Sequence, residues 1–404
     1  MPTPLPAQAL PTLRTRLYPA YYASFHCLAD CCRDDCCQGW KITFSKKDYL
    51  ALKRARKSPE LEAATTKALR RLRGENTYGF YAEFATHEGH CPFFNERGLC
   101  SLQLECGEGV LPDVCRTFPR KRLYTYSERA DSLSPACEGV LQLLWDLPDG
   151  IDFVEEDLPR KDWRERPRQP QSMLFPLLRE RCIDILQARQ FSLERRLLLL
   201  GLALEPIGRE GWELDAAAWA RRVDLLLSDP TLSQDLERLS ANRGGFLVDR
   251  MRLILRLVAQ QPFFGRVRDF FQGEASRQED EQTIHCDPEI YERAAQALKE
   301  GLGDLEPFFE NLLVSVFFYL GYPRMGQPED VWRSYVNLCN LWGLYRFAAV
   351  AGYGLEPTRA GLFRALVMAS RCSLHNDQRM GELREELFDN NSATLAHMAV
   401  LIQG

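Results

Sequence analysis

The chain has 404 residues, with 51 Lys and Arg against 56 Asp and Glu, a formal net charge of −5, and 45% hydrophobic residues. These values are typical of a globular protein and exclude a wholly disordered chain. The net negative charge argues against a dedicated nucleic-acid-binding protein. The length favours two domains over a single core.

The first residues, "MPTPLPAQALP", have neither the basic segment nor the apolar segment of a secretory signal. The most apolar run, "LLLLGLAL" at 197–204, is far shorter than a bilayer requires. We therefore expect a cytoplasmic protein with no membrane partner.

The N-terminal third is rich in cysteine. Fourteen cysteines occur in the chain, and the stretch "CCRDDCCQGW" at 31–40 places four of them within seven positions. Ten precede residue 138, namely Cys27, Cys31, Cys32, Cys36, Cys37, Cys91, Cys100, Cys106, Cys115 and Cys137. We predict that the other four, Cys182, Cys286, Cys339 and Cys372, are buried free thiols.

Three explanations account for such clustering. Disulfides are disfavoured because the chain is long and has no export signal. Structural zinc fits four thiolates at short spacing, although the adjacent Cys36 and Cys37 point in different directions. An iron–sulfur cluster also suits soft thiolate ligands, and the spacing alone does not separate it from zinc.

Basic residues dominate the segment that follows the first cysteines. Residues 41–73 contain eleven Lys or Arg and three Asp or Glu, a local excess of eight. The excess fits either a solvated helix surface or a docking surface for an acidic partner.

We predict an irregular, cysteine-rich metal-binding domain at 1–145, a linker at 146–172 and an all-α domain at 173–404, so that the fold is mainly α. Four prolines and dense charge in the linker disfavour regular structure. Leu247, Met251, Ile254 and Val258 recur at helical spacing. Another helix is predicted to begin at Asp287–Pro288 and end at Gly301, and "PFFENLLVSVFFYLGYP" predicts a buried helix that ends at Gly321.

Two cysteine blocks carry a family resemblance. "FHCLADCCRDDCCQGWKI" and "CPFFNERGLCSLQLECGEGVLPDVCRTFPR" together resemble the cysteine-cluster family of zinc- or iron-chelating proteins, and within it the flagellin lysine-N-methylases. Eight thiols match the family pattern and are its expected metal ligands: Cys27, Cys32, Cys36, Cys37, Cys91, Cys100, Cys115 and Cys137. Cys31 and Cys106 are additional to it.

The resemblance implies transfer of methyl groups from S-adenosylmethionine to lysines of flagellin, with an iron–sulfur cluster of the 4Fe-4S type, or zinc as the alternative. The cluster would either assist the methyl donor or only stabilise an irregular domain. "SRCSLHN" resembles a methylase stretch more weakly, and we predict Arg371 and His375, four residues apart on one helix face, as cofactor-binding. A packed, hydrogen-bonded structural role is the alternative for His375.

Two other functions remain open from the sequence. The first is a non-enzymatic protein that chelates or delivers zinc or iron, although a helical domain of some 230 residues would not be needed for that. The second is a redox sensor that uses Cys31 and Cys106, which would require exposed thiols of low pKa. No glycine-rich fingerprint for S-adenosylmethionine is present, and the catalytic base is not identified.

Overall fold

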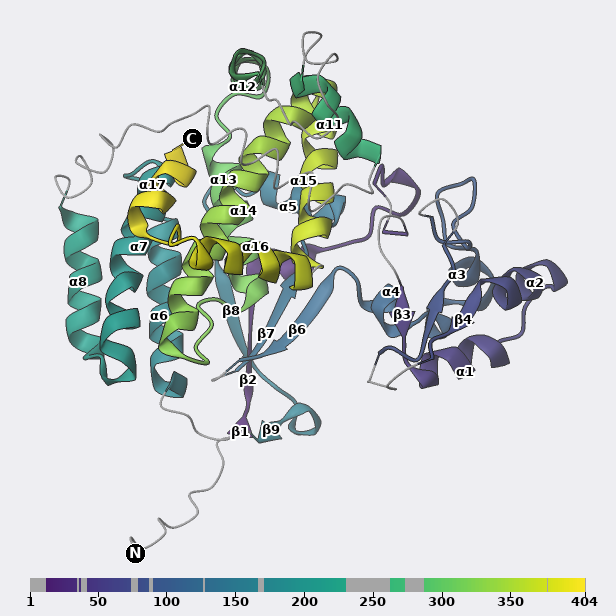
Figure 1. Cartoon of the computed structure of the whole chain (residues 1–404). Coiled ribbons are helices and arrows are strands. Elements are labelled where there is room, and N and C mark those ends of the chain that lie inside the picture. The colour runs from purple at the N-terminus through teal and green to yellow at the C-terminus, as the bar shows by residue number, and fades with distance from the viewer. Residues whose placement is uncertain are drawn as a thin grey trace, which may run out of the picture.

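A computed structural model of the chain describes residues 12–34, 36–37, 42–73, 79–86, 90–125, 128–165, 171–229, 262–272, 287–375 and 377–403. These residues are mostly helical, and the strands lie in the first 165 residues (Figure 1). The predicted mainly α fold is thus confirmed in part. No helix in the described ranges combines the length and the apolar character that crossing a membrane requires.

A mixed four-stranded sheet lies beside the helices. Its order is β6 (Arg120–Tyr124), β7 (Arg129–Leu133), β2 (Thr15–Pro19) and β8 (Phe153–Asp157). Strand β2 runs parallel to β7, with Leu17 opposite Ala130, and antiparallel to β8. A separate pair joins β1 (Thr12–Leu13) to β9 (Arg164–Glu165). Strand β2 is therefore an interior strand of the sheet.

This sheet was not predicted, and its charges explain why. Arg129 and Asp131 are buried on β7 and bond to each other at 2.8 Å, while Arg16 on β2 pairs with Glu156 on β8. Because ion pairs replace apolar side chains on this face, the strands lack the alternation that marks a half-buried strand. The segment 146–172, predicted to have no regular structure, supplies β8.

A smaller unit contains the basic segment. It has the three-stranded order β3 (Thr43–Phe44), β5 (Ala82–Phe84) and β4 (Leu69–Arg71), with short helices around it. The helices are α1 (Lys46–Arg54), α2 (Pro59–Ala68), α3 (Ser101–Cys106) and α4 (Asp113–Thr117). Ser45 and Ser58 cap α1 and α2 by accepting hydrogen bonds from backbone N–H groups in the first turn.

The helical part comprises α5 to α8 and α11 to α17. Their bounds are α5 (Glu138–Trp145), α6 (Gln171–Leu186), α7 (Leu193–Glu210), α8 (Ala216–Ser228), α11 (Pro262–Gln272), α12 (Pro288–Leu302), α13 (Glu306–Leu320), α14 (Pro328–Leu355), α15 (Arg359–Leu374), α16 (Asp377–Asp389) and α17 (Leu395–Gln403).

Two predicted helices are confirmed. The Asp287 carboxylate caps α12 by accepting from the Glu289 N–H at 2.9 Å, and the helix ends at Gly303, two residues beyond the predicted glycine. Helix α13 ends at Gly321, whose φ of +67° is the left-handed conformation that favours glycine. The helix predicted around Leu247 and Val258 lies outside the described residues.

The described residues form two hydrophobic cores. The smaller uses side chains between Ile42 and Leu111, and the larger joins the helices to the sheet region through residues such as Tyr21 and Leu133. Described residues before 146 therefore contribute to both cores, and the domain boundary at residue 145 stays a prediction.

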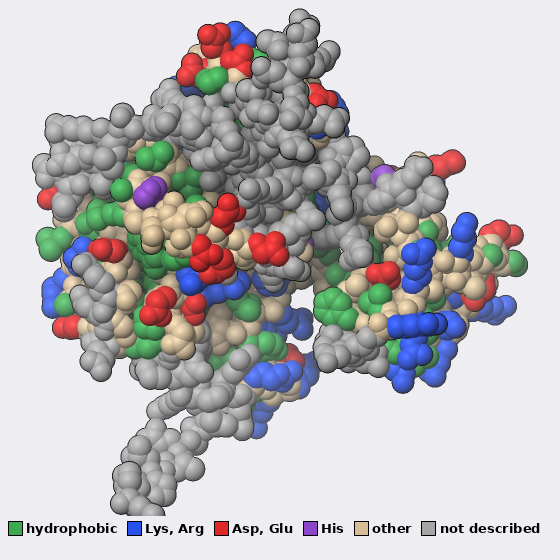
Figure 2. All heavy atoms as spheres, viewed as in Figure 1, with side chains coloured by type: hydrophobic (Ala, Val, Ile, Leu, Met, Phe, Trp, Pro, Cys, Tyr) green, Lys and Arg blue, Asp and Glu red, His purple; other side chains and the backbone are tan. Residues whose placement is uncertain are grey.

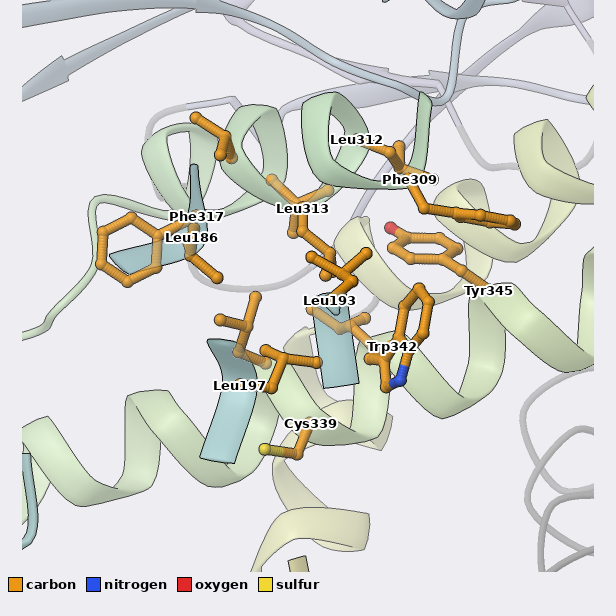
Figure 3. Close-up of a cluster of buried hydrophobic side chains, with 14 of the residues drawn as sticks. Leu186, Leu193, Leu197, Phe309, Leu312, Leu313, Phe317, Cys339, Trp342 and Tyr345 are labelled. Carbon is orange, nitrogen blue, oxygen red and sulfur yellow. The ribbon is translucent and has the colours of Figure 1, made fainter. Parts of the chain in front are cut away.

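Helix α14 lies at the centre of the larger core. Figure 3 shows Trp342 and Tyr345 of α14 facing Phe309 of α13 and Leu193 of α7. Fully burying such a side chain contributes about 1.5–3 kcal/mol. This dense packing fixes the positions of α13, α14 and α15. Polar side chains on these helices are therefore also held in fixed positions.

Candidate functional site

Five predicted ligand thiols are close to one another in or beside the small unit. Cys91 is buried, and its N–H donates to the Cys37 carbonyl at 2.9 Å. Hydrogen-bonding contacts with Cys36 and Cys91, together with burial, raise the pKa of Cys37. Burial raises the pKa of Cys100 and of Cys115, and the nearby Cys91 and Cys36 thiols add to the effect.

The other three predicted ligands lie at the start of α5. Cys137 is the N-cap of α5, and burial raises its pKa to about 11, with the charges of Cys36 and Cys27 adding to the shift. Burial also raises the pKa of Cys32 to about 12, followed by the charges of Glu138 and Cys137. Cys36 therefore lies close to both groups of thiols.

Donor chemistry and geometry give different answers about a metal. Burial and neighbouring thiols raise the pKa of these cysteines, so their thiolate forms need a bound cation to neutralise the charge. Thiolates that bind a metal are found in such an environment. Across the described residues, however, no three Cys, His, Asp or Glu side chains converge as a metal ion would require. The thiols fit iron or zinc by the type of donor atom, and metal binding stays a prediction.

Arg371 contacts the cysteine-bearing chain directly. It lies on α15, is 4% exposed, and its Nη2 donates to the Asp34 carbonyl at 2.8 Å. Asp34 follows Cys32 by two residues, and its carbonyl also accepts from the Cys32 thiol at 3.4 Å. The predicted cofactor-binding arginine is thus in contact with the first cysteine block.

Glu138 is a polar contact that the sequence analysis missed. Its Oε2 accepts from the backbone N–H groups of Arg33 at 2.8 Å and Asp34 at 3.4 Å. The Cys32 thiol lies 3.8 Å from the same oxygen. The available signal was a carboxylate directly after Cys137, at the first position of a helix.

His375 lies at the C-terminal end of α15, facing the loop that joins β7 to α5. Its Nε2 is 3.2 Å from the Ser134 hydroxyl, and its ring packs near Phe118 and Tyr319. His375 thus faces the segment that carries Cys137, whereas Arg371 contacts the backbone of the first cysteine block. These contacts are compatible with the structural role weighed from the sequence, and cofactor binding stays a prediction.

The basic segment forms an exposed surface on the small unit. Figure 2 shows Lys and Arg side chains gathered over this unit. The exposed members are Lys46, Lys47, Lys53, Arg54, Arg56, Lys67, Arg70, Arg71 and Arg73. The Arg71 guanidinium stacks over the Tyr81 ring at 4.9 Å, which orients part of this surface.

The remaining cysteines are the two thiols additional to the family pattern, Cys31 and Cys106, and the four that follow residue 138. Cys31 is exposed, and the half-buried Cys106 donates to the Arg56 carbonyl at 3.5 Å. Cys182 and Cys339 are buried free thiols as predicted, whereas Cys372 is only half-buried. Cys286 lies outside the described residues. Burial raises the pKa of Cys106, which disfavours the low-pKa thiol that a redox sensor needs.

The structure therefore defines a class: a helical protein whose central helices contact a thiol-rich N-terminal region. A family model described as "FliB lysine N-methylase C-terminal domain" matches residues 179–401, more than half of the chain. The chain belongs to the FliB lysine N-methylase family. The matched residues include Arg371 and His375 and lie beyond all eight predicted thiol ligands.

Similar proteins bear related names. The chain is 30% identical over 186 residues to a protein named Lysine-N-methylase from Salmonella typhimurium (strain LT2), and equally to one from Salmonella choleraesuis (strain SC-B67). This alignment covers 45% of the chain and 45% of each relative. "Flagellar biosynthetic protein FliU" of Salmonella muenchen is 32% identical over 141 residues, which are 34% of the chain and 81% of that protein. No solved structure matches.

Proposed function

We propose that the protein transfers methyl groups from S-adenosylmethionine to the ε-amino groups of lysines on flagellin. The family match over residues 179–401 carries this proposal. The name FliU, with its flagellar role, supports a flagellar substrate. The alignments reach less than half the length of the lysine-N-methylases, so activity and substrate are both part of the proposal.

We also propose that four of the eight thiols hold an iron–sulfur cluster. What supports this is the soft donor set and the closeness of Cys36 to thiols of both groups. A bound cluster would supply a redox-active iron centre held by soft thiolate ligands. The protein's own task is to give the target lysine a neutral nitrogen, because a protonated amine has no lone pair with which to accept a methyl group.

The first experiment joins metal analysis to a methylation assay. Protein purified without oxygen would be analysed for iron, sulfide and zinc, and then incubated with radiolabelled S-adenosylmethionine and purified flagellin. Mass spectrometry would locate methylated lysines, and flagellin with chemically blocked lysines would serve as the control substrate. Label on flagellin lysines supports the proposal, whereas metal-bound, folded protein that transfers none contradicts it.

The same preparation tests the metal-chelating alternative. Comparable iron and sulfide favour the cluster. Stoichiometric zinc without methyl transfer would favour a protein that only binds or delivers metal, a function for which the crowded thiols are the observation in favour.

The exposed basic surface on α1, α2 and β4 is proposed as the flagellin docking surface. Charge reversal of Arg70, Arg71 and Arg73 should weaken binding and reduce its dependence on salt, because attraction between exposed charges is screened by ions. Reversal of Arg266 and Arg268 on α11 provides a control outside this surface and is matched in charge change by the double reversal of Arg70 and Arg71. Equal binding by both variants would exclude the surface.

A further inference from the structure

Residues 32–34 are held between two helices that are far apart in sequence. Glu138 at the start of α5 accepts from the Arg33 and Asp34 N–H groups at 2.8 and 3.4 Å. Arg371 on α15 donates to the Asp34 carbonyl at 2.8 Å. Two oppositely charged side chains therefore bind donors and acceptors of the same short stretch of backbone.

Burial makes these contacts specific. Glu138 and Arg371 are each 4% exposed, and Asp34 is 7% exposed. A buried charge is stable only when it is paired or hydrogen-bonded, so the two side chains and the backbone between them stabilise one another. The Asp34 carboxylate adds a longer contact, 3.7 Å from Arg364 Nε, also on α15.

The thiols nearest this contact are predicted ligands. The Cys32 thiol lies 3.8 Å from Glu138 and 3.4 Å from the Asp34 carbonyl. An extended chain spans at most about 3.6 Å per residue, so fixing Asp34 confines the backbone of Cys36 to within about 7 Å and that of Cys37 to within about 11 Å.

The segment 25–34, hereafter the arm, also packs closely on α5 just before this contact. A side chain on Gly139 would bring its Cβ within 3.3 Å of Leu28 and 3.4 Å of Phe25. The chain on both sides of Cys27 is thus seated against the same helix that begins at Cys137. The first cysteine block therefore contacts α5 and α15 in addition to the small unit.

We propose that Glu138 and Arg371 are positioning residues that fix the first cysteine block on the helical domain, so that its thiols face those of the second block. The proposal rests on the proposed function only for the role of the thiols as ligands. Its direct measurement is the order of the arm, which can be observed whether or not the protein methylates flagellin.

Hydrogen exchange in the full-length protein is the first test. The Arg33 and Asp34 amides should be protected although they lie outside helices and strands, because they donate to a buried carboxylate. Hydrogen bonds to charged groups correspond to about tenfold or more in an equilibrium constant, so protection of at least that size is expected. Exchange of both amides at the rate of an unstructured peptide would overturn the proposal, even if no variant could be purified.

Substitutions then separate positioning from general stability. Arg371→Met should speed exchange at Arg33 and Asp34 by about tenfold or more and increase maleimide labelling of Cys32. Arg371→Lys, which keeps one donor and the charge, should restore part of the protection.

Arg196→Met supplies the matched control, because Arg196 is a similarly buried arginine that donates instead to Glu306, Glu310, Leu186 and Phe191. Under conditions in which both variants are folded, the control should leave local exchange in the arm unchanged, although it lowers the overall stability. Unchanged protection in folded Arg371→Met, or equal loss in Arg196→Met, would overturn the positioning role.

Discussion

A matched pair of glycine-to-alanine substitutions tests the packing of α14 against α15, the helix that carries Arg371. Gly352 lies on α14, and a Cβ added there would be 2.5 Å from the Ala365 Cβ and 2.5 Å from the Gly361 carbonyl oxygen. Neither atom belongs to a flexible side chain, so the two helices would have to separate. Gly208 on α7 provides the comparison, because a Cβ there meets nothing within 4 Å.

Helix propensity and overpacking together determine the expected changes in the free energy of unfolding. Alanine stabilises a helix interior by about 0.8–1 kcal/mol relative to glycine at either position. Overpacking at Gly352 costs about 1–3 kcal/mol, and this cost is absent at Gly208. Gly208→Ala should therefore stabilise the protein, and Gly352→Ala should be less stable than Gly208→Ala by about 1–3 kcal/mol.

Urea unfolding followed by far-ultraviolet circular dichroism would measure both variants under the same conditions. The helix propensity term is common to the pair, so the difference in unfolding free energy reports the contact between α14 and α15. Equal stabilisation by the two substitutions would refute the close approach of these helices.

Three further predictions follow from named contacts. Cys37→Ser should lower bound iron, whereas Cys106→Ser should retain it, as elemental analysis would show; equal retention would remove Cys37 from the ligands. Arg196→Met should lower the free energy of unfolding by about 3–5 kcal/mol because it breaks a buried ion pair. Arg181→Met, which breaks a more exposed pair, should lower it by only about 0–1 kcal/mol. Urea unfolding would measure both, and equal losses would contradict the prediction. Burial raises the pKa of Tyr345 to about 12 from about 10 when unfolded. Stability should therefore fall as the pH rises from 10 to 12, and Tyr345→Phe should reduce that slope; an unchanged slope would contradict the burial of the Tyr345 hydroxyl.

Local signals in the sequence were sufficient to predict helices α12 and α13. Asp287 and Pro288 begin α12 because one caps the first turn and the other has no N–H to lose there. Gly321 ends α13 because the chain adopts a left-handed conformation at that residue. Both effects act within a few residues and are visible without knowledge of the partner segments.

The sheet and the contacts of the candidate site depend on distant residues. Strand β2 pairs with strands more than a hundred residues later in the chain, and its Arg16 is matched by Glu156. Glu138 gave no pattern of its own, because its partners are backbone amides of another segment. Arg371 was selected through a family resemblance, and only the structure places it at the Asp34 carbonyl.

The placement of the thiols bears on the choice between an enzyme and a metal-binding protein. The small unit already contains or adjoins Cys37, Cys91, Cys100 and Cys115, which would be enough ligands for a metal held by that unit alone. Cys32 and Cys137 instead lie at the start of α5, next to Glu138 and within the reach of α15. Thiols that are distributed over both parts of the molecule can act together only if the helical domain fixes their positions. This arrangement favours a function in which the helical domain and the thiols contribute to one site over metal binding by the small unit alone.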